Sequence, residues 1–288
     1  VLHFYATGSY QRPCGKSFDI AVAQPTLSFY IEEITQILNR PDIVRRFIKF
    51  PETDEQVQAC VERMGAKVPN TLGYLDGTLI KMIKPSVEDH VQAYIGRKNF
   101  ALMNVMVTCD KRMLFLNFVA RFPGATNDAY IFRQSALRQR MKILFEREDA
   151  PLCFLIGDSG FALEPWLMCP FARNDEPQDE DSPEARFNND LCSDRSIVER
   201  AIGLWKNRWR AALGERVLRY APLKVCQISI ATAILHNICI LEQVPGYAVP
   251  NMQWQNDHVN NEVDEDNVLD LGRQVRDRLM NAMEQNRQ

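Results

Sequence analysis

The sequence has few of the features that build zinc sites, disulfide frameworks or membrane spans. None of its eight cysteines forms a Cys-x-x-Cys pair, and its four histidines are scattered, which argues against a zinc site. Most cysteines lie in apolar runs, where a free thiol acts as a small hydrophobic side chain. We therefore expect a reducing compartment, the cytosol or the nucleus. No apolar run reaches the roughly 18 residues that a membrane span requires.

The chain also lacks a strong charge of either sign. A formal charge of −3 gives no global attraction to nucleic acid, so any contact with DNA must depend on local basic patches. The apolar fraction of 46% over 288 residues allows a full core, in one large domain or two smaller ones. No secretory signal is apparent. Because the chain begins at Val1 rather than Met, its start does not define the natural N-terminus.

Carboxylates follow apolar segments at two places in the chain. Asp158 follows the run at residues 152–156 and begins the turn Asp158-Ser159-Gly160, and Asp76 follows Leu75 and precedes Gly77. Glu199 lies near the start of a helix expected at residues 196–211. Hard divalent cations prefer carboxylate oxygens held by rigid elements. Two aspartates from strands and one glutamate from a helix predict a two-metal phosphoryl-transfer site.

The expected order of elements points to a particular α/β architecture. Strands are predicted at residues 74–83, 100–108 and 113–120, with a hairpin turn at 109–112. A helix at 129–139 follows, then a buried strand at 152–156 and an apolar helix at 222–241. This order is typical of the ribonuclease H fold, whose mixed sheet is flanked by helices. The metal carboxylates of that fold lie on its first and fourth strands.

The remaining segments divide the chain into three parts. Residues 1–70 are predicted to be a helical region that resembles a helix-turn-helix, with Thr26, Ser28 and Tyr30 facing outward. Two ordinary packed helices explain the same pattern equally well. Residues 71–241 form the catalytic domain, within which 174–194 is expected to be a solvated acidic loop because it contains two prolines. Residues 242–288 are a polar tail, disordered over 246–268, with a terminal helix at 268–283.

An ordered series of motifs over residues 5–241 resembles the Harbinger transposase-derived nucleases of the PIF/Harbinger DDE superfamily. A single tetrapeptide would be weak evidence, but the order of the series is specific. The matching segments are Ala6-Thr7-Gly8-Ser9-Tyr10-Gln11, Tyr74-Leu75-Asp76-Gly77-Thr78, Tyr94 with Arg97-Lys98, Phe122-Pro123-Gly124 through Asp128, Ile156-Gly157-Asp158-Ser159-Gly160-Phe161, Phe187-Asn188, Val198-Glu199-Arg200-Ala201 and Leu235-His236-Asn237.

The resemblance implies a ribonuclease H-like core with a DDE triad that depends on Mg²⁺ or Mn²⁺. The triad maps onto Asp76, Asp158 and Glu199, with Asp76 bridging two ions and each of the others completing one coordination shell. The family further implies DNA as substrate, a nuclear location and a separate Myb-like partner protein. The chain departs from the family at Ile202, in a segment that is more commonly Ala-Phe-Gly-x-Leu, and at Asn127, where His is frequent.

Each predicted ligand also fits a purely structural role. Asp76 fits an ordinary turn residue before a glycine, and Asp158 fits a turn or helix cap. Glu199 completes a Ser196-x-x-Glu199 capping box, a role that one carboxylate cannot combine with binding a metal. Asp128 is a candidate for orienting a metal ligand. We leave it out of the triad, because a position between the third strand and a helix is expected to lie farther from the metals.

Basic side chains near these positions are candidates for contacts with DNA phosphates. A solvated helix face explains Lys206 and Arg208 equally well. We expect Trp205, Trp209 and His236 to be core residues rather than functional ones. The DNA-binding candidates are Arg97, Lys98, Arg195, Arg200, Lys206, Arg208 and Arg210.

The leading hypothesis is a metal-dependent DNA endonuclease or transposase. The main alternative is a domesticated DNA-binding or regulatory protein that keeps the fold without cutting. A weaker third possibility is a non-catalytic partner subunit that acts through the N-terminal helices. Three converging carboxylates favour the enzyme, since unpaired carboxylates would repel each other and destabilise a protein that only binds.

Overall fold

A mixed five-stranded sheet forms the centre of the computed structural model, which describes residues 1–15, 21–86, 91–96, 100–171, 182–213, 217–246 and 266–287. The strands lie in the order β3-β2-β1-β4-β5. β1 pairs antiparallel with β2, and β2 with β3, whereas β1–β4 and β4–β5 are parallel. The bounds are β1 Thr71–Met82, β2 Ala101–Cys109, β3 Phe115–Pro123, β4 Phe154–Ile156 and β5 Leu167–Met168.

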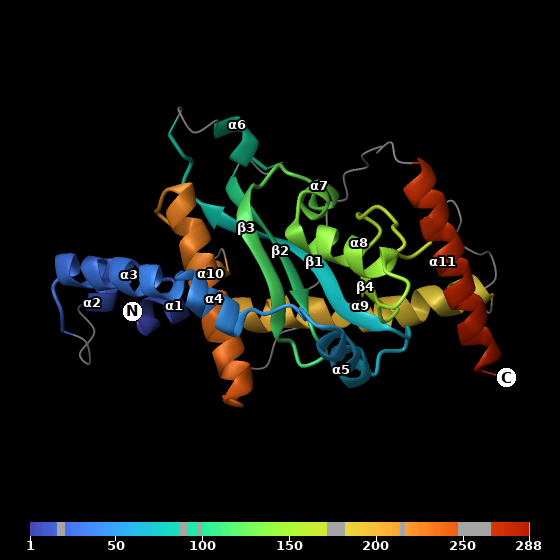
Figure 1. Ribbon diagram of the computed structural model, residues 1–288. Coiled ribbons are helices and arrows are strands. Elements are labelled where there is room, and N and C mark those ends of the chain that lie inside the picture. Colours follow the sequence, from blue (N-terminus) through green and yellow to red (C-terminus); the bar gives the residue numbers. More distant parts are fainter. Residues whose placement is uncertain are drawn as a thin grey trace.

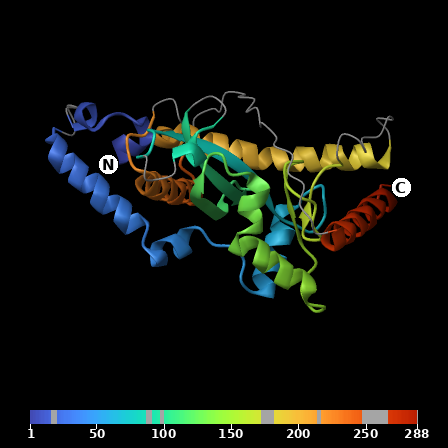
Figure 2. The ribbon, with the colours of Figure 1, turned by 90° about the horizontal axis from the view of Figure 1, so that it is seen from above.

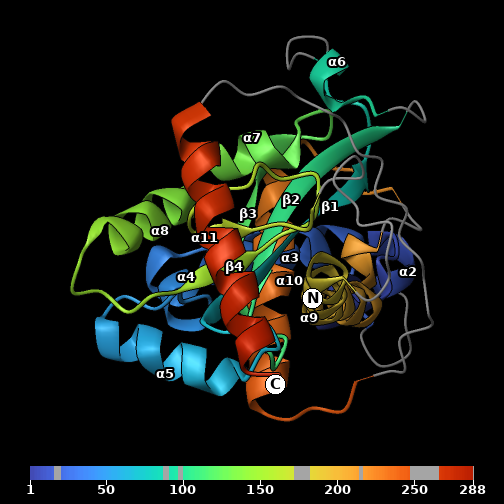
Figure 3. The ribbon, with the colours of Figure 1, turned by 90° about the vertical axis from the view of Figure 1, so that its right-hand side faces the viewer.

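Helices cover both faces of this sheet (Figure 3). One face packs against α5 (Asp54–Met64), α7 (Asp128–Arg133) and α8 (Ala136–Glu146), and the other against α9 (Pro183–Arg208) and α10 (Pro222–Leu241). Along β1, Leu75 belongs to the apolar core on the side of α5, α7 and α8, whereas its neighbour Tyr74 belongs to the core on the side of α9 and α10. Side chains alternate between the faces of a strand, so the two cores form on opposite sides. The mixed sheet flanked by helices is as predicted.

Helix α9 begins earlier than the sequence suggested. The Oγ of Ser182 accepts a hydrogen bond from the Ala185 amide, and Pro183 occupies the first turn. Proline is favoured there because the first amides of a helix have no partner within it. The prediction of an acidic loop at 174–194 is therefore wrong for residues 183–194, which are helical. Residues 172–181 lie outside the described part of the chain.

Other predicted elements differ in their details. The helix expected at 129–139 is two helices, because Ser135 caps α8 through a hydrogen bond from the amide of Arg138. Strand β5 has two residues, too few for a recognisable pattern in the sequence. The tight turn between β2 and β3 is built by Asp110, whose Oδ1 accepts hydrogen bonds from the amides of Arg112 and Leu114. The segment expected to be disordered falls largely on residues 247–265, which are not described.

Ahead of α5, the described residues form four helices: α1 (Leu2–Thr7), α2 (Gln11–Gly15), α3 (Gln24–Leu38) and α4 (Pro41–Phe47). They gather at one end of the molecule, and α3 and α4 pack against α10 (Figure 1). Leu27, Ile31 and Thr35 form the buried side of α3. The helix-turn-helix interpretation is not confirmed, and the division of the chain at residues 70 and 241 stays a prediction.

Helix α10 is the one element in the described part of the chain that is long and apolar enough to cross a membrane. The sequence had suggested that no run was long enough. Half of its most apolar window is buried, and the helix packs against β3, α3 and α4. This packing is that of a core helix. The short α6 (Val91–Tyr94) and the 3₁₀ helix η3 (Arg210–Ala212) complete the described elements before the C-terminal helix.

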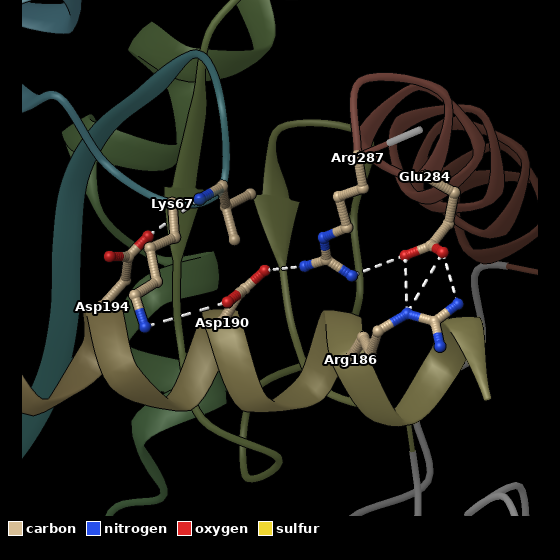
Figure 4. A network of polar contacts seen from close by, with 7 residues as sticks. Lys67, Arg186, Asp190, Asp194, Glu284 and Arg287 are labelled. Atoms are coloured by element: carbon tan, nitrogen blue, oxygen red, sulfur yellow. Dashed lines mark hydrogen bonds and ion pairs between the residues drawn. The ribbon is translucent and has the colours of Figure 1, made fainter. Parts of the chain in front are cut away.

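The terminal helix α11 (Asp266–Gln285) docks at the end of the molecule opposite the N-terminal helices (Figure 1). Figure 2 shows α9 extending between these two ends. Leu279, Met280 and Met283 bury one side of α11. Charged contacts join its last turns to the start of α9 (Figure 4): Glu284 pairs with Arg186 and Arg287, and Arg287 pairs with Asp190. The sequence predicts the helix but not this docking.

Candidate functional site

The register of β1 and β4 brings Asp76 and Asp158 to the same place. Tyr74 pairs with Ile156 across these parallel strands, and each aspartate lies two residues beyond its member of the pair. Because side chains alternate along a strand, Asp76 points to the same face as Tyr74, the face covered by α9. Asp158 lies just beyond the end of β4, close enough to Asp76 for its charge to raise the pKa of that carboxyl. Asp76 lies inside β1, so it is not a turn residue. The Oδ1 of Asp158 does accept a turn hydrogen bond from the Gly160 amide, at 3.0 Å.

Helix α9 supplies the third carboxylate. Arg195 joins the two elements: its Nη2 lies 2.5 Å from Oε1 of Glu199, and its Nη1 lies 3.9 Å from Oδ2 of Asp76. Ser196 lies in the middle of the helix, and its Oγ donates to the Ser193 carbonyl instead of capping. The alternative role of Glu199 in a capping box is therefore excluded, and its side chain, 43% exposed, faces the carboxylate cluster through Arg195.

The electrostatics of this cluster favour a cation. Burial, followed by the nearby Asp158 carboxylate, raises the pKa of Asp76 to about 8, although Arg195 opposes the shift. One guanidinium therefore does not compensate the charge of the site. The donors are all carboxylate oxygens, the type that Mg²⁺ and Mn²⁺ prefer, so their chemistry fits a divalent metal. Among the described residues, however, no three Asp, Glu, His or Cys side chains lie close enough together to hold a metal ion in their present positions.

Asp128 lies closer to this site than the sequence predicted. It begins α7, as expected, after the N-cap residue Asn127. Its Oδ1 accepts a 2.6 Å hydrogen bond from Asn104, and its carboxylate occupies the space that a side chain on Gly77 would fill. Gly77 follows Asp76 in β1, so Asp128 packs against the face of the strand opposite Asp76. It also contributes to the raised pKa of Asp76.

The predicted DNA-binding residues fall into three groups. Arg97 and Lys98 lie outside the described residues. Lys206 and Arg208 are buried and used within the fold: Nζ of Lys206 donates to the Leu79 carbonyl at 2.9 Å, and Arg208 donates to Val244. Burial lowers the pKa of Lys206 to about 7. Neither side chain reaches a phosphate from this position. Arg200 and Arg210 are exposed, and Arg195 is held by carboxylates.

Several residues of the family motifs stabilise the fold. The Asn188 side chain accepts a hydrogen bond from the Phe171 amide. His236 stacks on Phe115 and bonds the Met113 carbonyl, and Asn237 bonds both main-chain groups of Phe115. Together they fix the start of β3. The predicted core positions of His236, Trp205 and Trp209 are confirmed, since all three are buried.

The sequence does not reveal the role of Arg195 inside the carboxylate cluster. Arg195 and Glu199 are separated by four residues, the spacing at which side chains on a helix face each other and opposite charges pair. The prediction for Arg195 was phosphate binding. The spacing was the available signal, but the sequence alone does not show that Asp76 lies against the same guanidinium.

Comparison with known proteins identifies the family of the chain. The family model described as "DDE superfamily endonuclease" matches residues 75–237, a span that contains all three. The chain belongs to this family. The predicted relationship to the Harbinger transposase-derived nucleases is confirmed by its relatives. No solved structure matches the chain.

Most of the relatives carry a nuclease name. "Putative nuclease HARBI1" of Xenopus laevis is 31% identical over 243 residues, 83% of this chain and 66% of the relative. The protein of the same name from Bos taurus is 28% identical, over 83% of this chain and 65% of its own length. "Protein ALP1-like" of Arabidopsis thaliana is 29% identical over 67% of this chain and 48% of its own. The chain thus spans 65% of the length of the Bos taurus relative and 66% of the Xenopus laevis relative.

Proposed function

We propose that this DDE-family chain is a divalent-metal-dependent endonuclease that hydrolyses DNA phosphodiesters. The observation that carries the proposal is the convergence of Asp76 and Asp158, from adjacent parallel strands, on the face where α9 presents Glu199. A Mg²⁺ or Mn²⁺ ion held there by these carboxylates would supply an activated water and stabilise charge on the leaving 3′ oxygen. The family match and the nuclease-named relatives support this reading.

The chain's own residues have separate parts in this proposal. Asp76, Asp158 and Glu199 hold the metal, while Asp128 and Asn104 keep β1 in place from the other side of Gly77. Arg200 and Arg210 bind DNA phosphates and position the duplex without reading its sequence. By analogy with the family, we propose that the protein works in the nucleus with a Myb-like partner.

The test is nicking of supercoiled plasmid in Mn²⁺ by the wild-type protein and by Asp158→Asn. We expect nicking by the wild type only, with a Mn²⁺-dependent rise in melting temperature that the variant loses. Asp270→Asn, an exposed carboxylate on α11 paired with Arg273, is the matched control and should behave as wild type. Equal nicking by Asp158→Asn would remove that aspartate from the proposed site.

One observation favours the alternative of a DNA-binding protein that does not cut. Unpaired carboxylates are expected to destabilise such a protein, but Arg195 pairs with two of them. Arg195 thus offsets part of the repulsion between the carboxylates in the absence of a metal. A protein that binds DNA but shows neither nicking nor a melting-temperature rise in Mn²⁺ would establish this alternative.

A further inference from the structure

Arg195 occupies the space between two of the three carboxylates proposed to hold metal. Its side chain is only 20% exposed. Nη2 makes a close ion pair with Glu199, whereas Nη1 lies 3.9 Å from Asp76, beyond hydrogen-bond distance. Nη1 is buried and has no hydrogen-bond partner within the described part of the chain. The guanidinium is thus bonded to the carboxylate on the helix and only loosely held by the one on the sheet.

The charges of the cluster explain why a cation lies there. The nearby Asp158 carboxylate disfavours the ionised form of Asp76, and Glu199 adds a third carboxylate to the cluster. Without a metal, a positive charge from the protein itself reduces the repulsion between the ionised carboxylates. Arginine suits that role because its guanidinium does not lose its proton in proteins. A metal that binds both Asp76 and Glu199 must then compete with this guanidinium.

We propose that Arg195 is the internal counter-ion of the metal-free site: it holds Glu199 beside Asp76 and releases it when a divalent cation binds. This inference rests on the proposed function. Arg195 is a positioning residue in the metal-free protein. Once Glu199 is released, the guanidinium lies next to the site with its fork of donors free, and a DNA phosphate is the anion whose geometry matches that fork.

The test measures Mn²⁺ affinity from the electron paramagnetic resonance signal of free Mn²⁺, for the wild type, Arg195→Gln and Arg200→Gln. Removing the competing guanidinium should tighten Mn²⁺ binding about tenfold, the equivalent of one charge-assisted hydrogen bond. Arg200→Gln removes the same charge from an exposed position next to Glu199. It controls for long-range attraction and should change the affinity less than about threefold.

Two further measurements separate this role from a merely structural one. In EDTA, Arg195→Gln should melt at a lower temperature than the wild type, because its carboxylates have lost their counter-ion. Mn²⁺ should remove this difference in melting temperature. The same variant should nick plasmid more slowly despite its tighter Mn²⁺ binding, because the phosphate has lost a donor. Arg195→Lys keeps the positive charge without the forked donors of the guanidinium, so its Mn²⁺ affinity should lie between those of the wild type and Arg195→Gln. It also provides a variant that should fold better than Arg195→Gln.

The outcomes distinguish this inference from the function on which it rests. If Arg195→Gln and Arg195→Lys bind Mn²⁺ no more tightly than the wild type, Arg195 is not a competitor for the metal and the inference is overturned, while the nuclease proposal stands. If none of the proteins binds Mn²⁺, both are overturned. A gain in affinity that Arg200→Gln shares in full is a general charge effect and also overturns the inference.

Discussion

At the scale of single residues, the candidate site and its surroundings contain ionisable side chains whose charged forms are disfavoured by burial. Asp76 is buried in β1 beside Asp158, and both burial and that neighbour disfavour its ionised form. Lys206 is enclosed beneath the same strand, where burial lowers its pKa. Buried groups with shifted pKa values are typical of functional sites. In this chain Asp76 lies on β1 and Lys206 bonds the Leu79 carbonyl of the same strand, which brings two such charged groups to one part of the fold.

Substitution of Asp76 by asparagine should stabilise the metal-free protein at alkaline pH. The pKa of Asp76 is about 8 in the folded protein against 3.8 unfolded, so its stabilising contribution is complete below pH 3.8 and is lost as the pH rises to about 8. Asparagine does not ionise, and its Oδ1 can still accept the bond from the Gly77 amide. We expect a gain on the order of a few kcal/mol at pH 8, since one pKa unit corresponds to about 1.4 kcal/mol.

Denaturant unfolding in EDTA at pH 5 and pH 8 checks this expectation. The advantage of Asp76→Asn over the wild type should grow between the two pH values. Asp42→Asn is the control, because Asp42 is an exposed carboxylate on α4 bonded by Arg40, and it should show no such gain. An Asp76→Asn protein that is less stable than the wild type at pH 8 would mean that Arg195 already compensates the ionised carboxylate.

Individual residues also show where prediction from the sequence ended. Asp158 could be assigned because it directly follows a buried apolar run, and the ends of such strands are where α/β sheets bind their ligands. The register of β4 against β1 places it beside Asp76, where a metal site would need it. The nearness of Asp128 to Asp76 could not be predicted, because it depends on the missing side chain of Gly77 and on Asn104, which lies on a different strand. Contacts between distant segments leave no local pattern in a sequence.

At the scale of elements, long apolar runs were predictable and short or capped elements were not. β2 and α10 follow from largely hydrophobic segments, and their predicted bounds are close to those observed. β5 owes its existence to pairing with β4, so two residues suffice. The start of α9 was missed because proline in a polar segment is typical of loops. Proline is also favoured in the first turn of a helix, and Pro183 occupies that position directly after the N-cap residue Ser182.

Helix α11 should depend on its apolar side far more than on its ion pairs. Leu279 is buried against the core, whereas the Glu284 carboxylate and its arginine partners are partly exposed and screened by solvent. We expect Leu279→Ala to cost about 2–4 kcal/mol of docking free energy and Glu284→Gln to have little effect. Hydrogen exchange of the α11 amides measures both. Faster exchange in Glu284→Gln than in Leu279→Ala would show that the charged network shown in Figure 4 holds the helix.

At the scale of the whole molecule, the charge distribution limits how DNA can bind. The net charge of −3 gives no overall attraction, and two of the predicted DNA contacts, Lys206 and Arg208, are buried. Any affinity for DNA must then come from local groups of exposed cations, such as Arg200 and Arg210. An interface limited to these two would lose little affinity as salt rises, because the loss scales with the number of phosphates that are neutralised.

This argument gives a prediction for DNA binding in the absence of metal. Arg200→Gln and Arg210→Gln should each weaken binding equally for unrelated duplex sequences. Each should reduce the slope of log affinity against log salt by about 1, as expected for the loss of one phosphate contact.

Arg273→Gln is the matched control, an exposed arginine on α11 near the opposite end of α9 from Arg210, and should leave the slope unchanged. Fluorescence anisotropy in EDTA between about 50 and 200 mM salt measures the slopes. If all three variants keep the wild-type slope, the DNA lies on another face of the molecule. If Arg273→Gln alone reduces it, the duplex is held at the α11 end, far from the N-terminal helices.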